Sequence, residues 1–336
     1  MRRKVFIIVS LSILFFSSCI KESSGDPKKP LLGDPQIEVK TLLSGYEIIW
    51  GMDFLPDGDL IFGEKRGKLY RKTGETVTEI TGSPPVLSTG QGGLLDIRVH
   101  PDYSANGWIY ASYSAVNPGG GGQLRLIRFK ISNNQVGNIE NLLVTNGSNT
   151  WYGHYGSRIV FDGKGYLYLS VGEGGSSSYG GPNSGNNNAQ DLTSDWGKVH
   201  RLRDDGTIPD DNPVLGGNPL PGTIFSYGHR NPQGLAIHPE TGDVWQTEHG
   251  PRGGDEVNII VKGANYGWPV YSTGVNYDGS SISSGHTASG ITEPIYTWTP
   301  SIGICGMAFI TGDSFGSWKG NLLVSGLAPR NCKDAW

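Results

Sequence analysis

Five stretches of this 336-residue chain repeat one pattern: an alternating apolar strand, a turn made with Pro, Asp or Gly, and a second strand. They read "MDFLPDGDLIFGE", "LDIRVHPDYSANGWIYASYS", "SRIVFDGKGYLYLSVGE", "QGLAIHPETGDVWQTEHG" and "MAFITGDSFGSWKGNLLVSG". The gaps have room for further strands, for example at 68–72, 124–131 and 197–203. Four-stranded units repeated around an axis are typical of a β-propeller. A β-sandwich is the alternative, but a sandwich does not usually repeat one turn phrase five times.

The glycine content supports an all-β chain. Glycine makes up 52 of the 336 residues, about twice its usual share of roughly 7%. It clusters with Asp, Asn and Pro between short runs of Ile, Val, Leu, Tyr and Trp, which is how short strands joined by turns read. No amphipathic segment longer than about two helical turns is present.

The first residues are typical of an export signal. Basic residues at 2–4 precede an apolar run at 5–16, which is too short for a permanent membrane span. The ending Phe16-Ser17-Ser18-Cys19 resembles a bacterial lipobox, so we expect a signal at 1–19, a lipid anchor at Cys19 and a periplasmic lipoprotein. An ordinary secreted protein cut at another position is the alternative. Residues 20–40 read as a flexible tether, and 41–336 as the propeller catalytic domain.

The net charge and the cysteine content limit which binding partners and which disulfides we expect. The formal net charge is −4, and no basic stripe is visible, which argues against nucleic acid as a partner. If Cys19 carries lipid, Cys305 and Cys332 remain. They could pair in an oxidising compartment, but two cysteines establish no disulfide framework, and we expect both to be free.

Polar residues gather just outside the repeated phrases. "STGQGG" precedes the second phrase, "WYGHYG" the third and "SYGHRNP" the fourth, while "EHGPRGGDE" follows the fourth. Propellers bind ligands at one mouth of the central channel, where loops of successive blades converge. Four loops on glycine-rich backbone therefore predict one shared site.

Three of these loops carry candidate catalytic or binding groups. A neutral imidazole is a suitable general base at neutral pH, and His154 is the candidate; a histidine packed in a turn is the equally weighted alternative. Arg230 and Asn231 suit a planar anionic ligand, because a guanidinium fork matches carboxylate and quinone oxygens. The alternative is an arginine that bridges blades through backbone carbonyls. Gln91 is a further amide of this kind.

The fourth loop offers oxygen ligands. Asp255 and Glu256 stand beside a Gly/Pro backbone with free carbonyls, and such oxygens are what Ca²⁺ prefers. The spacing is not that of an EF-hand. Zinc is disfavoured because the histidines are scattered without HExxH or CxxC. The glycine-rich run 172–181 lacks the Lys-Ser/Thr of a phosphate loop and reads as a long mouth loop.

Several of these stretches resemble one family. "GQGGLLDIRVHPDY", "HYGSRIVFDGKGYLYLSVGE", "SYGHRNPQGLAIHPETG", "EHGPRGGDEVNIIVKGANYGWP" and "CGMAF" are similar to the soluble PQQ-dependent aldose (glucose/sorbosone) dehydrogenases. The resemblance covers roughly 41–328 and is most specific at 227–269. It implies a six-bladed propeller that holds pyrroloquinoline quinone (PQQ) and Ca²⁺ in its mouth. It also implies oxidation of the anomeric C–OH of aldoses to the lactone, with electrons passed to an acceptor such as a cytochrome or quinone.

The resemblance implies a role for each matched position. His154 matches the catalytic base, which takes the hydroxyl proton as hydride moves to the quinone. The matches to PQQ-contacting residues are Gln91, Arg230 and Asn231. The matches to calcium ligands are the carbonyls of Gly250 and Pro251 at the activating ion, and Glu256 with the Tyr266 carbonyl at a structural ion. The whole turn His229-Arg230-Asn231 is then expected to face the cofactor.

The chain departs from the family pattern near its end. Residues 328–330 stand where the family has a lysine, and the chain stops at Trp336, before a stretch that carries a further cofactor-binding arginine. We therefore expect a propeller that lacks its last C-terminal blade segment. A cofactor-free propeller that binds carbohydrate or hydrolyses lactones with calcium is the alternative function.

Overall fold

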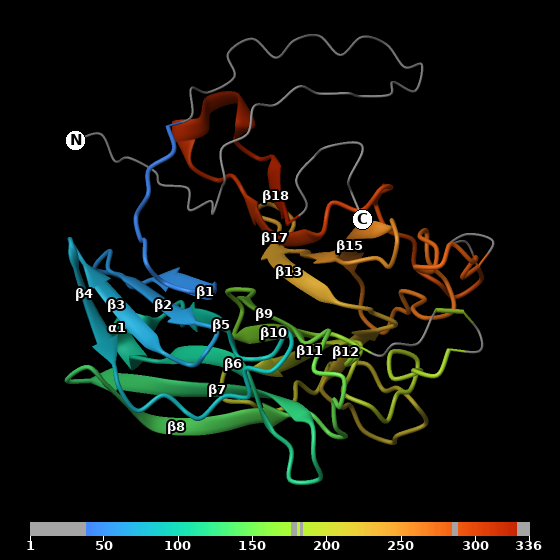
Figure 1. The fold of residues 1–336 in the computed structure, drawn as a ribbon, viewed down its shortest axis with the longest axis horizontal. Coiled ribbons are helices and arrows are strands. Elements are labelled where there is room, and N and C mark those ends of the chain that lie inside the picture. The colour runs from blue at the N-terminus through green and yellow to red at the C-terminus, as the bar shows by residue number, and fades with distance from the viewer. Residues whose placement is uncertain (1–37, 176–179, 182–183, 284–287, 328–336) are drawn as a thin grey trace.

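The computed structural model describes residues 38–175, 180–181, 184–283 and 288–327. These residues form four four-stranded antiparallel sheets and one two-stranded sheet (Figure 1). Their helices are a four-residue α1 (Tyr103–Asn106) and a 3-10 segment η1 (Asp313–Trp318). The expected all-β propeller fold is confirmed. The predicted signal at 1–19, tether residues 20–37, Cys332 and 328–330 lie outside the described residues.

Each sheet is one blade, and its strands follow one another from the inside to the outside. Blade 1 comprises β1 (Ile49–Phe54), β2 (Leu60–Glu64), β3 (Leu69–Thr73) and β4 (Thr76–Ile80). Blade 2 comprises β5 (Leu94–Val99), β6 (Ile109–Val116), β7 (Gly122–Ser132) and β8 (Gln135–Val144). Blade 3 comprises β9 (Gly156–Phe161), β10 (Tyr166–Val171), β11 (Lys198–Arg203) and β12 (Ile224–Tyr227). Blade 4 comprises β13 (Pro232–Ile237), β14 (Val244–Glu248), β15 (Asp255–Ile260) and β16 (Tyr296–Trp298). The last sheet pairs β17 (Ile304–Phe309) with β18 (Leu322–Gly326).

The repeated phrases are the two innermost strands of each sheet, from β1–β2 to β17–β18. The additional strands expected in the gaps are β3, β7 and β11. Two connections differ from a plain turn, because α1 and η1 occupy them. In the first case the longer connection closes one helical turn, and Gly107 ends it in the left-handed conformation (φ 70°) that glycine adopts without strain.

The innermost strands β1, β5, β9, β13 and β17 lie next to one another in chain order around the channel (Figure 1). Their approach is close. A Cβ on Gly51 of β1 would lie 2.4 Å from the carbonyl oxygen of Leu95 on β5. A Cβ on Gly234 of β13 would lie 2.7 Å from the carbonyl oxygen of Cys305 on β17. Glycine at these positions therefore lets neighbouring blades touch backbone to backbone.

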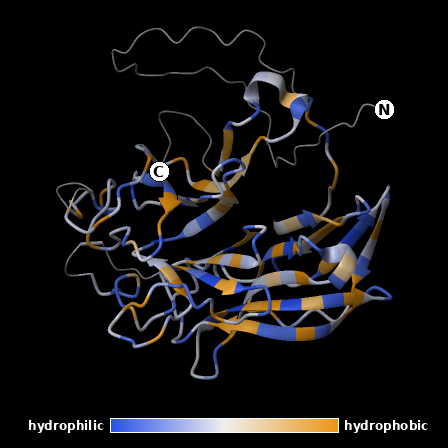
Figure 2. Cartoon of the chain, turned by 180° about the vertical axis from the view of Figure 1, so that it is seen from behind, coloured by the Kyte–Doolittle hydropathy of each residue, from blue (hydrophilic) through white to orange (hydrophobic). Residues whose placement is uncertain are grey.

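The apolar core is divided among the blade interfaces. Apolar and polar residues alternate along many strands (Figure 2), and successive side chains of a strand point to opposite faces of its sheet. One buried cluster lies between blades 1 and 2, including Ile61 and Ile97, and another between blades 2 and 3, including Leu126 and Leu169. A third lies between blades 3 and 4 around Val199. Each blade is therefore stabilised mainly by its neighbours along the chain.

A buried ion pair between Asp96 and Arg158 also connects the innermost strands. Asp96 of β5 is fully buried, and its carboxylate accepts from Arg158 NH1 of β9 at 2.7 Å and from the Ile159 amide at 2.8 Å. The Arg158 guanidinium lies 4.4 Å from the ring centre of Trp50 on β1, and its Nε donates to the carbonyl of Gln233 on β13 at 3.1 Å. One arginine thus connects the innermost strands of four blades.

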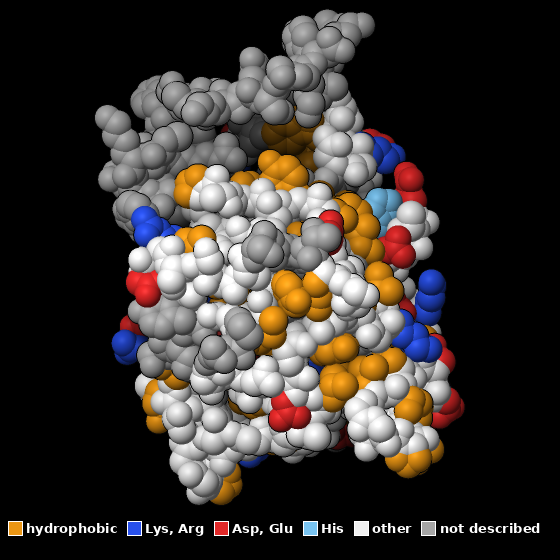
Figure 3. All heavy atoms as spheres, turned by 90° about the vertical axis from the view of Figure 1, so that its right-hand side faces the viewer, with side chains coloured by type: hydrophobic (Ala, Val, Ile, Leu, Met, Phe, Trp, Pro, Cys, Tyr) orange, Lys and Arg blue, Asp and Glu red, His pale blue; other side chains and the backbone are white. Residues whose placement is uncertain are grey.

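The surface is poor in charge on one side. In the view of Figure 3, charged side chains stand mostly at the edges, and apolar and uncharged polar atoms fill the middle. No helix of the described ranges is long and apolar enough to span a bilayer. Within those ranges Cys305 forms no disulfide.

Candidate active site

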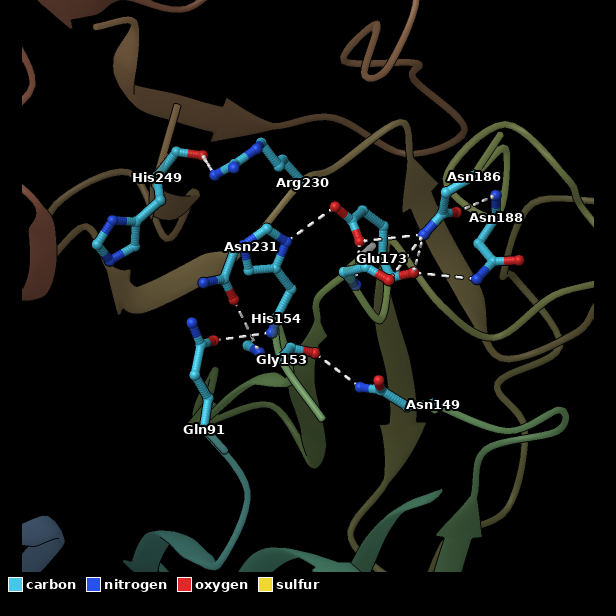
Figure 4. A network of polar contacts seen from close by, with 12 residues as sticks. Gln91, Asn149, Gly153, His154, Glu173, Asn186, Asn188, Arg230, Asn231 and His249 are labelled. Carbon is cyan, nitrogen blue, oxygen red and sulfur yellow. Dashed lines mark hydrogen bonds and ion pairs between the residues drawn. The ribbon is translucent and has the colours of Figure 1, made fainter. Parts of the chain in front are cut away.

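Residues from the four polar loops lie close together (Figure 4). Gln91 precedes β5, His154 precedes β9, and Arg230 and Asn231 lie between β12 and β13. The fourth loop, which contains Gly250, lies between β14 and β15. Each loop therefore lies where a blade's inner strands begin or end. The predicted convergence of loops from separate blades is confirmed.

Side-chain amides join these loops to one another. Gln91 Oε1 accepts from the backbone N–H of His154 at 2.7 Å, and the backbone N–H of Gln91 donates to the carbonyl of Tyr152 at 2.8 Å. Asn231 Oδ1 accepts from the N–H of Gly156 at 3.1 Å. Blades 2 and 4 thus both hold the loop of blade 3 that carries His154.

His154 is buried and has an unusual backbone. Its φ is +46°, a left-handed conformation that is uncommon for residues other than glycine and collects at functional sites. Its Nδ1 lies 2.8 Å from Glu173 Oε1 (Figure 4). A carboxylate can only accept, so Nδ1 donates and Nε2 keeps its lone pair. Burial lowers the pKa of His154; Arg230 lowers it further, and Glu173 opposes the shift. The imidazole is therefore neutral at neutral pH and available as a base.

Glu173 was not among the residues expected from the sequence. It follows β10, and its carboxylate also accepts from the Gly175 N–H and from Asn186 Nδ2 at 3.4 Å. A sequence signal for it exists. The first and third phrases both end in Gly-Glu, but Glu64 is the last residue of β2, whereas Glu173 lies two residues beyond β10. A carboxylate that closes a phrase next to the mouth loops is the sequence signal for such a partner.

His229 corrects the expectation that its whole turn faces a cofactor. The side chain is fully buried and stacks on Tyr266 with ring centres 4.6 Å apart. Its Nδ1 lies 3.0 Å from Glu248 Oε2, and its Nε2 lies 2.9 Å from Ser226 Oγ. Burial lowers the pKa of His229 to about 3, so it is neutral. The side chain of His229 thus lies between Ser226 of blade 3 and Glu248 of blade 4, buried away from the mouth.

Arg230 points into the site instead. Its NH1 donates to the Gly250 carbonyl at 2.8 Å, and its NH2 donates to the hydroxyl of Tyr277 at 3.1 Å. Its backbone N–H donates to Glu248 Oε1 at 2.6 Å. Its Nε is buried and has no hydrogen-bond partner among the described residues. A buried donor in this state suits an acceptor atom supplied by a bound ligand.

Tyr277 is a second residue that the sequence analysis missed. Its side chain is 66% exposed, and its hydroxyl is held by Arg230. The surrounding "NYDGSS" reads only as a turn, so the sequence carries no signal for its place in the site.

The expected calcium residues surround a single small cavity of about 10 Å³, which has room for one water-sized occupant. Its lining includes Gly250, Pro251, Glu256 and Tyr266. Two separate ion sites were expected, whereas the structure brings all four residues to one cavity. No group of three or more His, Cys, Asp or Glu side chains suited to a metal is found in the described part of the chain. Any ion here would therefore depend on backbone carbonyls.

Two carboxyl groups face this cavity. Burial raises the pKa of Glu248 to about 8, and burial together with the Glu248 carboxyl raises the pKa of Glu256 well above its usual range. The two residues pair across β14 and β15. Buried, adjacent carboxyls favour binding of a cation, which would return both to their charged form.

Comparisons with known proteins agree on one family. A sequence profile described as "Glucose / Sorbosone dehydrogenase" matches residues 46–334. The chain is 37% identical over 302 residues to "Aldose sugar dehydrogenase YliI" of Escherichia coli, covering 88% of this chain and 79% of that protein. The apo crystal structure of the soluble aldose sugar dehydrogenase from Escherichia coli matches with a TM-score of 0.77 and 37% identity, covering 83% of this chain and 80% of that chain. The PQQ-bound aldose sugar dehydrogenase of Streptomyces coelicolor matches with a TM-score of 0.63 and 30% identity, covering 83% and 78% of the two chains.

Proposed function

The chain belongs to the glucose/sorbosone dehydrogenase family, and we propose that it oxidises aldose sugars at the anomeric carbon to the lactone with PQQ as cofactor. The supporting observation is the buried His154–Glu173 pair, next to an arginine whose Nε still needs an acceptor. The PQQ-bound relative supports the choice of cofactor.

His154 is the base of the proposed reaction. Its Nε2 takes the proton of the anomeric hydroxyl, while the hydrogen on the same carbon leaves with its electron pair as hydride. The carbon–oxygen bond thereby becomes the lactone carbonyl, and the sugar has lost two electrons and two hydrogens. Bound PQQ supplies the quinone carbonyl that accepts the hydride. Glu173 fixes the imidazole tautomer and stabilises the positive charge that His154 acquires.

Three side chains would hold the cofactor. Arg230 offers a buried Nε donor, and its guanidinium lies 5.1 Å from the ring centre of Trp268. Gln91 and Asn231 are fixed in the same mouth by their bonds to the His154 loop. A guanidinium fork and two amides suit the carboxylate and quinone oxygens of PQQ.

Calcium is proposed at the cavity beside Arg230. The chemistry of the available donors supports it: carbonyl oxygens of Gly250, Pro251 and Tyr266, and carboxylates of Glu248 and Glu256. Oxygen ligands of this kind are those that Ca²⁺ takes. Bound calcium would neutralise the two buried carboxyls.

The test is reconstitution of the purified protein. With PQQ and Ca²⁺ we expect cofactor binding that calorimetry detects and reduction of an acceptor dye by D-glucose, with no turnover on NAD⁺ or NADP⁺. Cofactor binding without sugar-dependent dye reduction would refute the oxidation. Lactone hydrolysis in the absence of PQQ would favour the alternative of a cofactor-free hydrolytic module.

The control variant is His154→Ala. We expect PQQ affinity close to that of the wild type and a rate lower by at least about 10²-fold, because a base contributes to proton transfer and little to cofactor binding. A variant that retains most of its turnover removes His154 from the mechanism.

Three further proposals concern the number of blades, the location of the protein and its electron acceptor. A count of six blades extends the five sheets described here and is supported by the resemblance to the family. A periplasmic location with a lipid anchor at Cys19 is supported by the leader sequence alone. The electron acceptor is proposed to be a cytochrome or quinone, because a two-electron oxidation needs a redox partner.

A further inference from the structure

Trp151 occupies an unusual position beside the proposed base. Its side chain is 45% exposed, although a tryptophan gains from burial. Its ring centre lies 5.2 Å from that of His154, with the two planes at 71°. The indole therefore forms part of the surface next to the imidazole.

The loop around this indole is held by a buried asparagine. Asn149 Oδ1 accepts from the N–H of Tyr152 at 2.8 Å, and Asn149 Nδ2 donates to the carbonyl of Gly153 at 2.6 Å. Tyr152 has a left-handed φ of +60°. A fixed and strained backbone directly after Trp151 indicates that the position of the indole is set by the fold.

Two glycines make the space in which the ring lies. A Cβ on Gly153 would be 2.0 Å from Trp151 Cζ3, and a Cβ on Gly175 would be 2.1 Å from Trp151 Cε3. Any larger residue at either position would displace the ring. The indole thus packs against bare backbone on one side and stays partly open to solvent.

We propose that the exposed part of Trp151 stacks on the ring of the sugar substrate and sets its affinity. Pyranose rings carry apolar C–H bonds on their faces and hydroxyl groups at their rims. An indole face is apolar and electron-rich, so it attracts such C–H groups and loses its exposed area to the sugar. This inference rests on the proposed function, because it assigns the substrate contact of the same site.

The kinetic test uses Trp151→Ala in the PQQ-loaded protein with D-glucose. We expect KM to rise about three- to tenfold, with kcat changed less than about twofold, because a contact made equally in ground and transition states affects KM alone. Trp151→Phe retains an aromatic face and should recover most of the affinity. Tyr296→Ala is the matched control: Tyr296 is 58% exposed on the outermost strand β16 and should leave both constants unchanged.

An unchanged KM in Trp151→Ala overturns the proposal. So does a lower kcat at constant KM, which would mean that the indole only shapes His154.

A binding measurement separates this inference from the proposed function. Saturation-transfer NMR of the protein with D-glucose should show transfer from aromatic protons to the sugar ring in the wild type and in Tyr296→Ala, and a clear loss of it in Trp151→Ala. If the wild type shows no transfer, or Trp151→Ala retains it, the stacking is refuted even if the enzyme turns over. If transfer depends on Trp151 but no dye is reduced, the stacking stands and the proposed oxidation fails.

Discussion

Replacing Glu173 by Gln tests whether the carboxylate acts through the charge of His154. Glu173 Oε1 lies 2.8 Å from His154 Nδ1, and both side chains are almost fully buried. A glutamine has nearly the same shape, and its carbonyl oxygen can still accept from Nδ1, so the geometry is kept while the charge is removed. The measured effect should therefore be electrostatic.

The magnitude follows from the separation and burial. An opposite charge at this distance shifts a pKa by about 1–3 units. Glu173 raises the pKa of His154, so its loss should lower that pKa further below 6.5. One unit corresponds to about 1.4 kcal/mol, and the imidazolium formed in the reaction would lose about 1.4–4 kcal/mol of stabilisation. We expect turnover at neutral pH to fall by about 10- to 10³-fold.

The assay is the pH profile of kcat/KM with an acceptor dye. The neutral imidazole is the active form, so activity falls as the pH drops below the pKa of His154. In Glu173→Gln this acid limb should move to lower pH. The control Glu140→Gln removes a carboxylate that pairs with Arg128 on the surface of blade 2 and should move nothing. A limb that stays in place while the rate falls at every pH, or one that moves to higher pH, refutes the electrostatic role.

Three further changes probe the blade interfaces and the cofactor site. Asp96→Asn leaves the Arg158 guanidinium without its buried carboxylate partner and should lower the free energy of unfolding by about 3–5 kcal/mol. The change should appear as a lower urea midpoint, and an unchanged midpoint would contradict a stabilising role of this ion pair. Gly51→Ala places a methyl group 2.4 Å from a carbonyl oxygen of β5 and should lower the free energy of unfolding by about 1–3 kcal/mol or more. Gly137 has open space around it, so the control Gly137→Ala should leave the melting temperature unchanged. Equal melting temperatures of the two variants would contradict the close approach of β1 and β5. Arg230→Lys removes the Nε donor and the planar fork and should weaken PQQ binding about tenfold or more by calorimetry; unaltered affinity would exclude the arginine from the cofactor site.

Much of the fold could be predicted because its signal is periodic. The repeated phrase marks the two innermost strands of each sheet, since both alternate in hydropathy and meet at a turn rich in Gly and Asp. Loops at equal places in each repeat must then meet at one end of the ring. Gln91, His154 and Arg230 came together for this reason, even though they lie far apart in the sequence.

Side-chain direction within those loops could not be predicted. His229 and Arg230 are adjacent, yet one is buried against Tyr266 and the other reaches the site, and no periodicity describes an irregular turn. The left-handed backbone of His154 is set by contacts from other blades, which the local sequence does not contain. The single cavity shared by the expected calcium residues likewise depends on how β14 and β15 pair.

The amide bonds that join the mouth loops restrict how a protein like this one can acquire new preferences. Gln91 and Asn231 each fasten the His154 loop to another blade, so replacing either one to suit a different sugar would also loosen the scaffold. A substitution at either position would therefore destabilise the mouth loops even where it improves activity on a new sugar. Trp151 makes no such fastening bond among the described residues and stands partly in solvent. We therefore expect changes of sugar preference to arise most easily by substitution of Trp151 and of other exposed residues. The residues that hold the loops together should stay unchanged.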